Sequence, residues 1–320
     1  MQELLALSQL VEEQIKKVDF PKQPANLYDP LRYFLTLGGK RIRPVATLAA
    51  AKSFEAETEI ALSTAIAIEI FHNFTLIHDD IMDNAPLRRG KITVHEKWNT
   101  NIAILSGDVL FVEAYKLLAQ APNSVLPELL NVFNRTAIQV CEGQQMDMDF
   151  ESRNDVSVAE YLKMIELKTS VLLACAFEMG GIIAGADAFN RFHLYEFGLN
   201  LGLAFQIQDD YLDAFGSPEK VGKQVGGDIL ADKKTFLSLS AKALQSSLNE
   251  KDFHHYTTFS TPTEKVEKTK ALFSALSIDK KALELKLDYE RKADFHLEAL
   301  TCSNKEIFIE IRNFLANREH

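Results

Sequence analysis

The sequence contains few of the residues from which sheet turns are built. Glycine occurs 14 times in 320 residues, which is about 4% where roughly 7% is usual. No Asn-Gly or Asp-Gly pair joins two runs of alternating hydrophobicity, although such pairs are the strongest short hairpin signal. We therefore expect no strand.

Cysteine is also scarce. The chain has only Cys141, Cys175 and Cys302, which are far apart in the sequence and include no CxxC pair. Neither a disulfide framework nor a zinc site is indicated by this pattern. We expect a cytoplasmic protein.

Long hydrophobic runs are missing as well. The longest apolar stretch, residues 171–186, is interrupted by Glu178 and three glycines. It falls short of the roughly 18 uninterrupted apolar residues that are needed to cross a bilayer. The first 20 residues are amphipathic and acidic at their start, unlike a signal peptide. We expect no transmembrane segment.

The chain has no excess of positive charge. Its 35 basic residues are outnumbered by 45 acidic ones, for a formal charge of -10. Nucleic-acid binding requires a basic surface that neutralises phosphates, so we expect no nucleic-acid partner. A bound anion must instead meet local clusters of basic residues. No linker rich in Pro, Gly or Ser divides the chain, which favours one large domain over residues 1–320.

What the sequence does contain is helical periodicity along most of its length. Apolar residues recur three and four positions apart in the stretches 4–15, 61–77 and 108–120. This spacing places them on one face of an α-helix. The sequence therefore predicts an all-α fold.

Three carboxylates follow one of these apolar helices, in the stretch DDIMD. On a helix, Asp79 and Asp83 lie one turn apart and Asp80 lies three positions before Asp83, so their Cβ atoms form one patch roughly 5–6 Å across. Neighbouring carboxylates repel each other, and burial adds a desolvation cost, so the patch is unfavourable without a cation. A single copy is also compatible with a solvated helix end.

The same pattern recurs in DDYLD, which again follows an apolar run. Asp209, Asp210 and Asp213 repeat the spacing of the first motif. Oxygen ligands without His or Cys suit Mg²⁺, which binds one or two carboxylates and leaves other positions for phosphates and water. The two motifs together predict a site where Mg²⁺ ions hold a diphosphate.

Basic residues gather in turn-like stretches near both motifs. They are Lys40, Arg41 and Arg43 in GGKRIRP, Arg88 and Arg89 in PLRRGKITVH, Lys168 beside Thr169 in ELKTS, and Lys223, Lys233 and Lys234 in KVGKQVGGDILADKKT. Arginine makes bidentate contacts with phosphate and lysine acts as a point charge. Each cluster alone is compatible with a solvated charged surface, whereas their occurrence with two DDxxD motifs favours diphosphate binding.

In their order along the chain, these stretches resemble those of the trans-isoprenyl diphosphate synthases, or polyprenyl synthetases. The shared stretches are GGKRIRP, FHNFTLIHDDIMD, LRRG, GDVLF, EGQQMD, ELKTS, FQIQDDYLD, GKQVGGD and KKT. The resemblance covers most of the chain. It implies an all-α helical bundle around a deep central cavity, usually homodimeric, with both aspartate motifs on facing helices at the mouth.

The resemblance also implies a reaction and its residues. Isopentenyl diphosphate and an allylic diphosphate (dimethylallyl, geranyl or farnesyl) would condense head to tail with the help of three Mg²⁺ ions. All six aspartates, Asp79, Asp80, Asp83, Asp209, Asp210 and Asp213, would form the metal site, with Asp79, Asp83 and Asp209 foremost as direct ligands. The implied contacts are Arg88, Lys168 and Lys233 for the allylic phosphates, with Lys223 a further candidate, and Lys40, Arg43, His72 and Arg89 for isopentenyl diphosphate.

In the implied mechanism, pyrophosphate leaves as an allylic carbocation forms, and the double bond of isopentenyl diphosphate attacks that cation. Fixed charges lower the cost of this charge separation in an apolar cavity. Lys168, Thr169 and Gln206 would direct oxygen dipoles toward the carbocation, while apolar walls exclude water. Loss of a proton completes the extension.

Residues before the first motif would set the length of the product. In the family, a bulky residue four or five positions before the first aspartate stops chain growth early. Here these positions hold Thr75 and Phe74, with Phe71 one turn deeper, and DDIMD lacks the two-residue insertion of many bacterial farnesyl synthases. This combination resembles the type that makes geranylgeranyl (C20) diphosphate, with farnesyl (C15) diphosphate as the alternative.

Two other functions share parts of this pattern. Class I terpene cyclases have an all-α fold and a DDxxD motif, but their second metal motif mixes Asn, Ser and Glu. A non-catalytic partner subunit of a synthase would usually lose one aspartate motif. The presence of DDYLD and GGKRIRP argues against a cyclase, and the presence of both aspartate motifs argues against a non-catalytic subunit.

Overall fold

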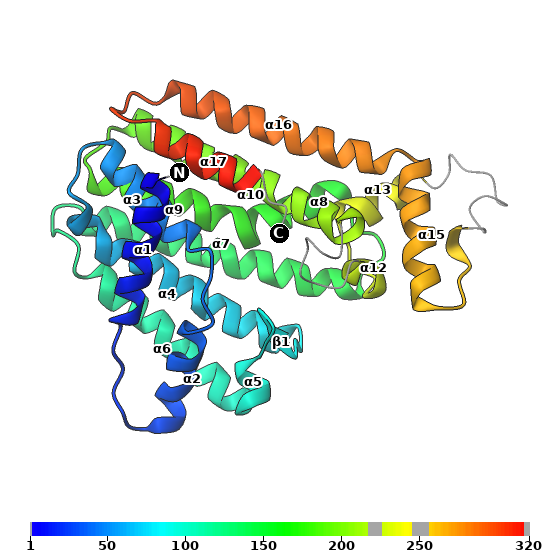
Figure 1. Ribbon diagram of the computed structural model, residues 1–320, viewed down its shortest axis with the longest axis horizontal. Helices are drawn as coiled ribbons and strands as arrows, with labels where there is room; N and C mark the ends of the chain where they lie inside the picture. The colour runs from blue at the N-terminus through cyan, green and yellow to red at the C-terminus, as the bar shows by residue number, and fades with distance from the viewer. Residues whose placement is uncertain (1, 217–225, 245–255, 317–320) are drawn as a thin grey trace. The chain divides into compact units, whose positions relative to one another are not determined.

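The computed structural model describes residues 2–216, 226–244 and 256–316, and most of them lie in helices (Figure 1). The prediction of an all-α fold is confirmed. The longer helices are α1 (Gln2–Lys16), α2 (Ala25–Leu35), α3 (Ile42–Ser53), α4 (Thr58–Met82), α6 (Thr100–Leu118), α7 (Leu126–Ser152), α9 (Val171–Ile183), α10 (Ala188–Phe215), α15 (Pro262–Ala275), α16 (Ile278–Ala299) and α17 (Glu306–Ala316). The shorter ones are α5 (Val94–Lys97), α8 (Val158–Ile165), the π-helix η1 (Glu166–Ser170), α12 (Gly227–Leu230) and α13 (Phe236–Leu244).

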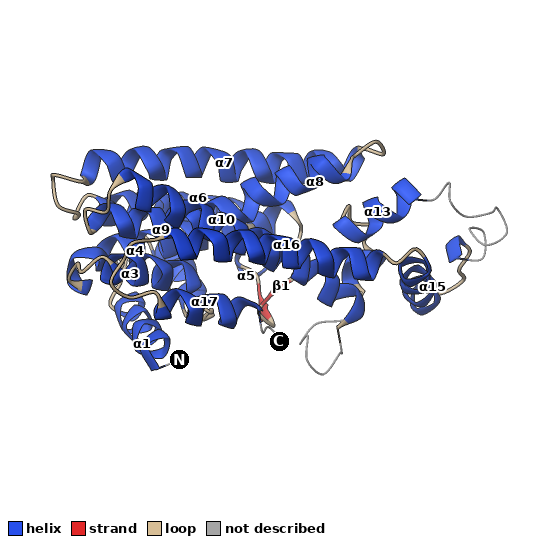
Figure 2. Cartoon of the chain, turned by 90° about the horizontal axis from the view of Figure 1, so that it is seen from above, coloured by secondary structure: helices blue, strands red, loops and turns tan. Residues whose placement is uncertain are grey.

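The expectation of no strand was wrong at one place. Strands β1 (Leu87–Arg88) and β2 (Lys91–Ile92) pair in an antiparallel hairpin, drawn in red in Figure 2. Its two turn residues, Arg89 and Gly90, have φ angles of 54° and 72°. Two successive positive φ angles are typical of a type I′ hairpin turn. Arg-Gly thus makes here a turn that Asn-Gly or Asp-Gly makes more often, which is why the pattern of pairs did not predict it.

The chain folds into two compact units, which are described separately. Unit 1 comprises residues 1–137, 172–195 and 299–311, and unit 2 comprises residues 138–171, 196–298 and 312–320. The chain passes from one unit to the other within helices such as α7 and α10. The assignment of residues 1–320 to a single domain stays a prediction.

Unit 1 is built around α4. This helix packs against α3 and α6, and residues 64–71 are all buried. The length and mean hydropathy of α4 would allow it to cross a membrane, but 61% of the apolar window is buried inside the protein. That burial is typical of a core helix. Helix α1 covers the unit with a stripe of Leu4, Leu7, Val11 and Ile15.

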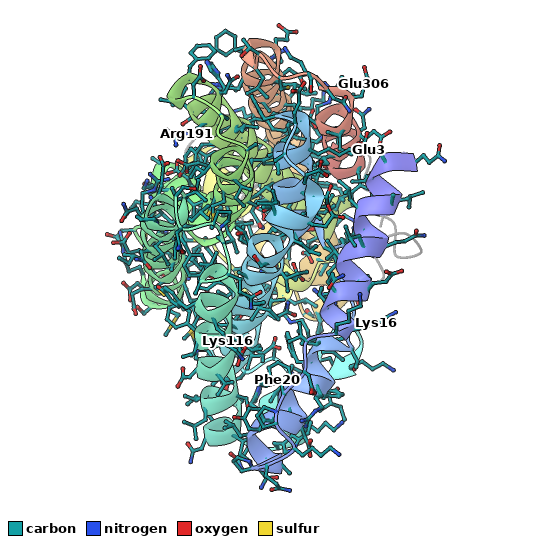
Figure 3. All side chains as sticks on the ribbon, turned by 90° about the vertical axis from the view of Figure 1, so that its left-hand side faces the viewer. Glu3, Lys16, Phe20, Lys116, Arg191 and Glu306 are labelled. Atoms are coloured by element: carbon teal, nitrogen blue, oxygen red, sulfur yellow. The ribbon has the colours of Figure 1, made fainter. Side chains whose placement is uncertain are left out.

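The N-terminus of α1 meets a much later part of the chain. Figure 3 shows Glu306, at the start of α17, close to Glu3 at the start of α1. The backbone nitrogen of Leu4 donates a hydrogen bond to Glu310 at 3.2 Å. The first and last described helices are therefore joined within unit 1.

Unit 2 has its own buried core. Helix α8, which contributes to that core, begins with a capping box. The Ser157 hydroxyl accepts from the Glu160 nitrogen at 3.2 Å, and the Glu160 carboxylate accepts from the Ser157 nitrogen at 2.9 Å. This reciprocal pair satisfies two donors that a helix start leaves unpaired. The α8 residues Tyr161, Met164 and Ile165 then enter a buried cluster with side chains of α10, α13, α15 and α16.

Candidate active site

The first aspartate motif lies at the C-terminal end of α4, in unit 1. Asp79 is half-buried and Asp83, the C-cap residue, is exposed. The Asp83 nitrogen donates to the Asp79 carbonyl at 2.8 Å, so the two residues are one helical turn apart. The C-terminus of a helix carries partial negative charge, which repels carboxylates. A bound cation would offset this repulsion.

Asp80, between them, is directed into the protein. Its side chain is 1% exposed, and its Oδ1 atom accepts from Arg88 Nε at 2.9 Å and from Arg88 Nη2 at 2.6 Å. Burial raises the pKa of Asp80, and the hydrogen bonds from Arg88 act in the opposite direction. The charged pair connects the end of α4 to β1, and thereby fixes the position of Arg88 beside the motif.

A second group of unit 1 residues brings the predicted isopentenyl diphosphate contacts together. Arg43 Nη1 lies 3.1 Å from His72 Nε2. A Cβ on Gly39 would stand 3.0 Å from both terminal nitrogens of Arg89, so that guanidinium lies directly on the glycine backbone. Gly39 has a φ of 157°. The loop 38–41 thus carries Lys40, which is exposed, next to the arginines.

The charges in this group are concentrated. Burial, and then the positive charge of Arg43 and Arg89, lower the pKa of His72 well below 6.5. Burial lowers the pKa of Arg43, and the neighbouring Arg89 lowers it further. Partial burial also lowers the pKa of Arg89, followed by the charge of Arg41. Cations that disfavour each other in this way form a site for an anion.

Arg41 holds this loop from inside. It is 3% exposed and donates through Nε to Glu12 at 2.7 Å and through Nη1 to Glu69 at 2.6 Å. Asn73 Nδ2 donates to the same Glu69 carboxylate at 3.2 Å. Because its guanidinium is committed to these carboxylates, Arg41 supports the loop, and Arg43, two positions later, reaches His72.

The second aspartate motif lies near the end of α10, in unit 2. Asp209 and Asp213 are half-buried, whereas Asp210 is 5% exposed. Burial raises the pKa of Asp210 to about 7, although its hydrogen bond from Tyr161 acts in the opposite direction. Asp213 Oδ2 accepts from the Asp228 backbone nitrogen at 3.0 Å, which ties the motif to α12.

The stretch ELKTS forms the π-helix η1, not a regular α-helix. Lys168 Nζ donates to Asp147 Oδ2 of α7 at 2.6 Å, and Thr169 is half-buried. Gly143 of α7 and Gly202 of α10 both approach η1, because a Cβ on either would come within 2.7 Å of its backbone. Single π turns are frequent at functional sites. The close backbone contacts hold Lys168 and Thr169 in this conformation.

The remaining predicted residues of unit 2 lie around α10 and α12. Gln206 Nε2 donates to Asp210 Oδ1 at 3.3 Å. Lys233 is exposed, with Nζ 3.9 Å from Asp228 Oδ1. Asp210, Asp213 and Lys233 help to line a pocket of about 200 Å³.

Aromatic rings gather in unit 1 around the part of α4 that precedes Asp79. Phe71 and Phe74 have ring centroids 5.6 Å apart, and Phe74 stacks on Phe111 of α6 at 5.0 Å with an interplanar angle of 23°. Phe71 also contacts Phe133 of α7 at 5.0 Å, and Tyr115 contacts both Phe111 and Phe133 at 5.2 Å. We name these five rings, which belong to α4, α6 and α7, the aromatic cluster.

Residues 24–276 match the family model described as Polyprenyl synthetase. The chain belongs to the polyprenyl synthetase family. It is 37% identical over 317 residues to the geranylgeranyl pyrophosphate synthase of Geoglobus acetivorans, covering 98% of this chain and 97% of that protein. It is 39% identical over 252 residues to the geranylfarnesyl diphosphate synthase of Natronomonas pharaonis, covering 73% and 74%.

Solved structures agree with this assignment. A crystal structure of a geranylgeranyl pyrophosphate synthase has 45% sequence identity and a TM-score of 0.90, covering 99% of this chain and 98% of that one. The predictions of the family, of an enzyme and of a trans-prenyltransferase that condenses isopentenyl diphosphate with an allylic diphosphate are confirmed.

Within this family member, the predicted site residues fall into the two units. Unit 1 contains Lys40, Phe71, Arg43, His72, Phe74, Thr75, Asp79, Asp80, Asp83, Arg88 and Arg89, and unit 2 contains Lys168, Thr169, Gln206, Asp209, Asp210, Asp213 and Lys233. Lys223 lies outside the described residues. The ligand roles assigned to these side chains stay predictions.

Sequence reasoning missed several residues that complete these groups. Asp147 had appeared only as part of EGQQMD, and Phe111 only as part of GDVLF. Tyr161, which donates to Asp210, lies seven positions before Lys168 in an ordinary amphipathic helix. A residue such as this has no motif signal of its own, because its partner is contributed by another helix.

Proposed function

We propose that this polyprenyl synthetase makes geranylgeranyl (C20) diphosphate, with farnesyl (C15) diphosphate as the alternative product. The observation that carries the proposal is the aromatic cluster, in which Phe74 of α4, five positions before Asp79, stacks on Phe111 of α6. A chain growing from Asp79 along α4 meets these rings after a few isoprene units. The names of the relatives support a short product as well.

Isopentenyl diphosphate binds, in this proposal, to Lys40, Arg43, His72 and Arg89. The support is their clustering in unit 1, where Arg43 reaches His72 at 3.1 Å, and where burial, followed by the positive charge of neighbouring arginines, lowers the pKa of His72 and Arg89. A diphosphate would relieve the repulsion between these positive charges, so binding the substrate offsets an electrostatic cost already present in the fold.

The residues present fit Mg²⁺. Asp79, Asp83 and Asp209 offer only hard oxygen ligands, and the first two lie at a helix end that disfavours unneutralised carboxylates. Among residues 2–216, 226–244 and 256–316, no three acidic, His or Cys side chains stand close enough together to hold a metal ion. In proteins, Mg²⁺ binds one or two carboxylates and completes its coordination with phosphate oxygens and water. When bound, three Mg²⁺ ions would neutralise the diphosphate and favour its departure.

The side chains of the protein bind the phosphates, stabilise the carbocation and exclude water. Arg88, Lys168 and Lys233 bind the allylic phosphates, with Lys223 as a further contact, and hold the departing pyrophosphate in place. Thr169 and Gln206 direct oxygen dipoles at the carbocation, while the aromatic cluster excludes water from it. After the new carbon–carbon bond forms, the departing pyrophosphate accepts the proton that is lost.

The enzyme acts in the cytoplasm as a homodimer. The outer side of α6 carries Ile104, Leu105 and Val112, all large, apolar and exposed. A row of this kind along one helix is costly in water and is covered when a second copy packs against it. Sedimentation analysis of the Val112→Glu variant tests this, since the charged side chain should shift the protein toward monomer.

One assay tests the proposed function. The purified protein is incubated with Mg²⁺, labelled isopentenyl diphosphate and dimethylallyl, geranyl or farnesyl diphosphate in turn, and products are identified by mass spectrometry. We expect incorporation with a C20 end product. Incorporation that stops elsewhere contradicts the proposed length. No incorporation with any primer would favour the partner-subunit alternative, and a cyclic hydrocarbon product would favour a terpene cyclase.

A further inference from the structure

Both oxygens of Asp210, the middle residue of the second motif, are engaged by groups inside unit 2. The Tyr161 hydroxyl donates to Oδ2, and the backbone nitrogen of Phe236 donates to the same atom at 3.3 Å. Gln206 Nε2 donates to Oδ1 at 3.3 Å. Helices α8, α10 and α13 thus meet at one carboxylate.

This carboxylate is also shielded from solvent. Asp210 is 5% exposed and Tyr161 is 3% exposed, and the tyrosine ring packs in the buried cluster with Phe150 and Ile207. Asp209, its neighbour, is half-buried. Consecutive residues on an α-helix point about 100° apart. Fixing Asp210 inward therefore determines the direction in which Asp209 points.

We propose that Tyr161 is a positioning residue for the second aspartate motif, acting through Asp210, which does not ligate metal. The hydroxyl of Tyr161 sets the rotation of the end of α10. That rotation orients Asp209 toward Mg²⁺ and Gln206 toward the allylic group. The inference rests on the proposed function and assigns the two adjacent aspartates different tasks.

The contacts give this role a physical basis. A buried carboxylate that loses one of its donors keeps its desolvation cost without the compensating bond. The Asp210 side chain would then turn or admit water, and α10 would lose its fixed orientation at this point. Tyr161→Phe removes only the hydroxyl and leaves the ring in the core, so packing is conserved.

The test compares Tyr161→Phe with the wild-type enzyme and with Tyr289→Phe. Tyr289 is a half-buried residue on α16 of the same unit, which makes it a matched loss of one hydroxyl. We expect Tyr161→Phe to raise the Mg²⁺ concentration for half-maximal activity and the KM for the allylic diphosphate by roughly tenfold each. The KM for isopentenyl diphosphate should stay within about twofold, because its proposed contacts lie in unit 1.

A binding experiment provides a readout that does not depend on turnover. Inorganic pyrophosphate with MgCl₂ is titrated into each protein by calorimetry, and binding to Tyr161→Phe should weaken by a similar factor. An unchanged Mg²⁺ requirement with only a lower melting temperature would make Tyr161 merely structural and overturn the inference. A wild-type enzyme that is inactive with every primer refutes the proposed function instead.

A second pair of variants keeps the inference testable should Tyr161→Phe fold poorly. Asp210→Asn retains an oxygen that can accept from Tyr161, whereas Asp209→Asn removes a proposed metal ligand. We expect a clearly smaller increase in the Mg²⁺ requirement for Asp210→Asn than for Asp209→Asn. An equal increase for the two variants would show that Asp210 ligates metal, and the inference would fail.

Discussion

A Cβ atom on Gly143 of α7 would stand 2.2 Å from the backbone nitrogen of Lys168 in η1. No nonbonded pair tolerates that distance, and the atom encountered belongs to the backbone, so it cannot turn aside as a side chain would. The two segments are in contact backbone to backbone. This contact fixes the position of a residue that we propose binds the allylic phosphates.

The Gly143→Ala variant is therefore expected to displace η1. We expect about 1–3 kcal/mol lower free energy of unfolding, which is typical of overpacking, and a higher KM for the allylic diphosphate. Urea unfolding and steady-state kinetics measure the two effects. Cys141→Ala, at an exposed position of the same helix, is the control. A Gly143→Ala protein with wild-type stability and KM would show that η1 is free to move.

Asp79→Asn should separate activity from stability. Removing a proposed metal ligand is expected to lower turnover roughly a hundredfold or more at saturating Mg²⁺. The melting temperature without Mg²⁺ should stay the same or rise, because a negative charge leaves a helix C-terminus. Glu142→Gln, on the exposed side of α7, controls for loss of charge. Near-normal turnover would remove Asp79 as a ligand.

Phe74→Ala should lengthen the product. The substitution opens the aromatic cluster at the ring that stacks on Phe111, and the growing chain can then pass further along α4. Mass spectrometry of the products measures the shift, and Phe189→Ala, at an exposed aromatic residue of unit 1, should leave the products unchanged. If both variants give the wild-type chain length, Phe74 does not limit growth.

The His72 imidazole should be uncharged in the free enzyme at pH 6.5, the ordinary pKa of histidine, and at pH values just below it. Burial and the charge of Arg43 lower its pKa well below 6.5. The unfolded chain then binds the proton more readily than the folded one, so stability is complete above pH 6.5 and decreases as the pH falls toward the folded pKa. NMR titration of the imidazole and pH-dependent unfolding test this, with His72→Gln as the control. A folded pKa at or above 6.5 would contradict it.

The sequence predicted well those features that depend on spacing within one helix. The apolar run before DDIMD forms the buried body of α4, and Asp79 and Asp83 lie one turn apart at its end, as expected. These features are local, and helix geometry alone relates the residues involved.

Features that depend on another helix could not be predicted. The spacing of DDxxD does not tell which carboxylate is directed inward, since that depends on Arg88 for Asp80 and on Tyr161 for Asp210. The π conformation of ELKTS is likewise invisible in a periodicity of apolar residues. It becomes understandable only with Gly143 and Gly202 packed against it.

The π turn also determines what a deletion in the segment Glu166–Ser170 would do. A π turn accommodates one residue more than an α-helical turn would, and its hydrogen bonds have poorer geometry than those of the helices beside it. Deleting one residue between Glu166 and Ser170 would restore a regular helix and relieve that cost. It would also rotate the following helix by about 100°. The extra residue thus carries a cost in stability, and in the proposed function it places Lys168 and Thr169 for substrate binding.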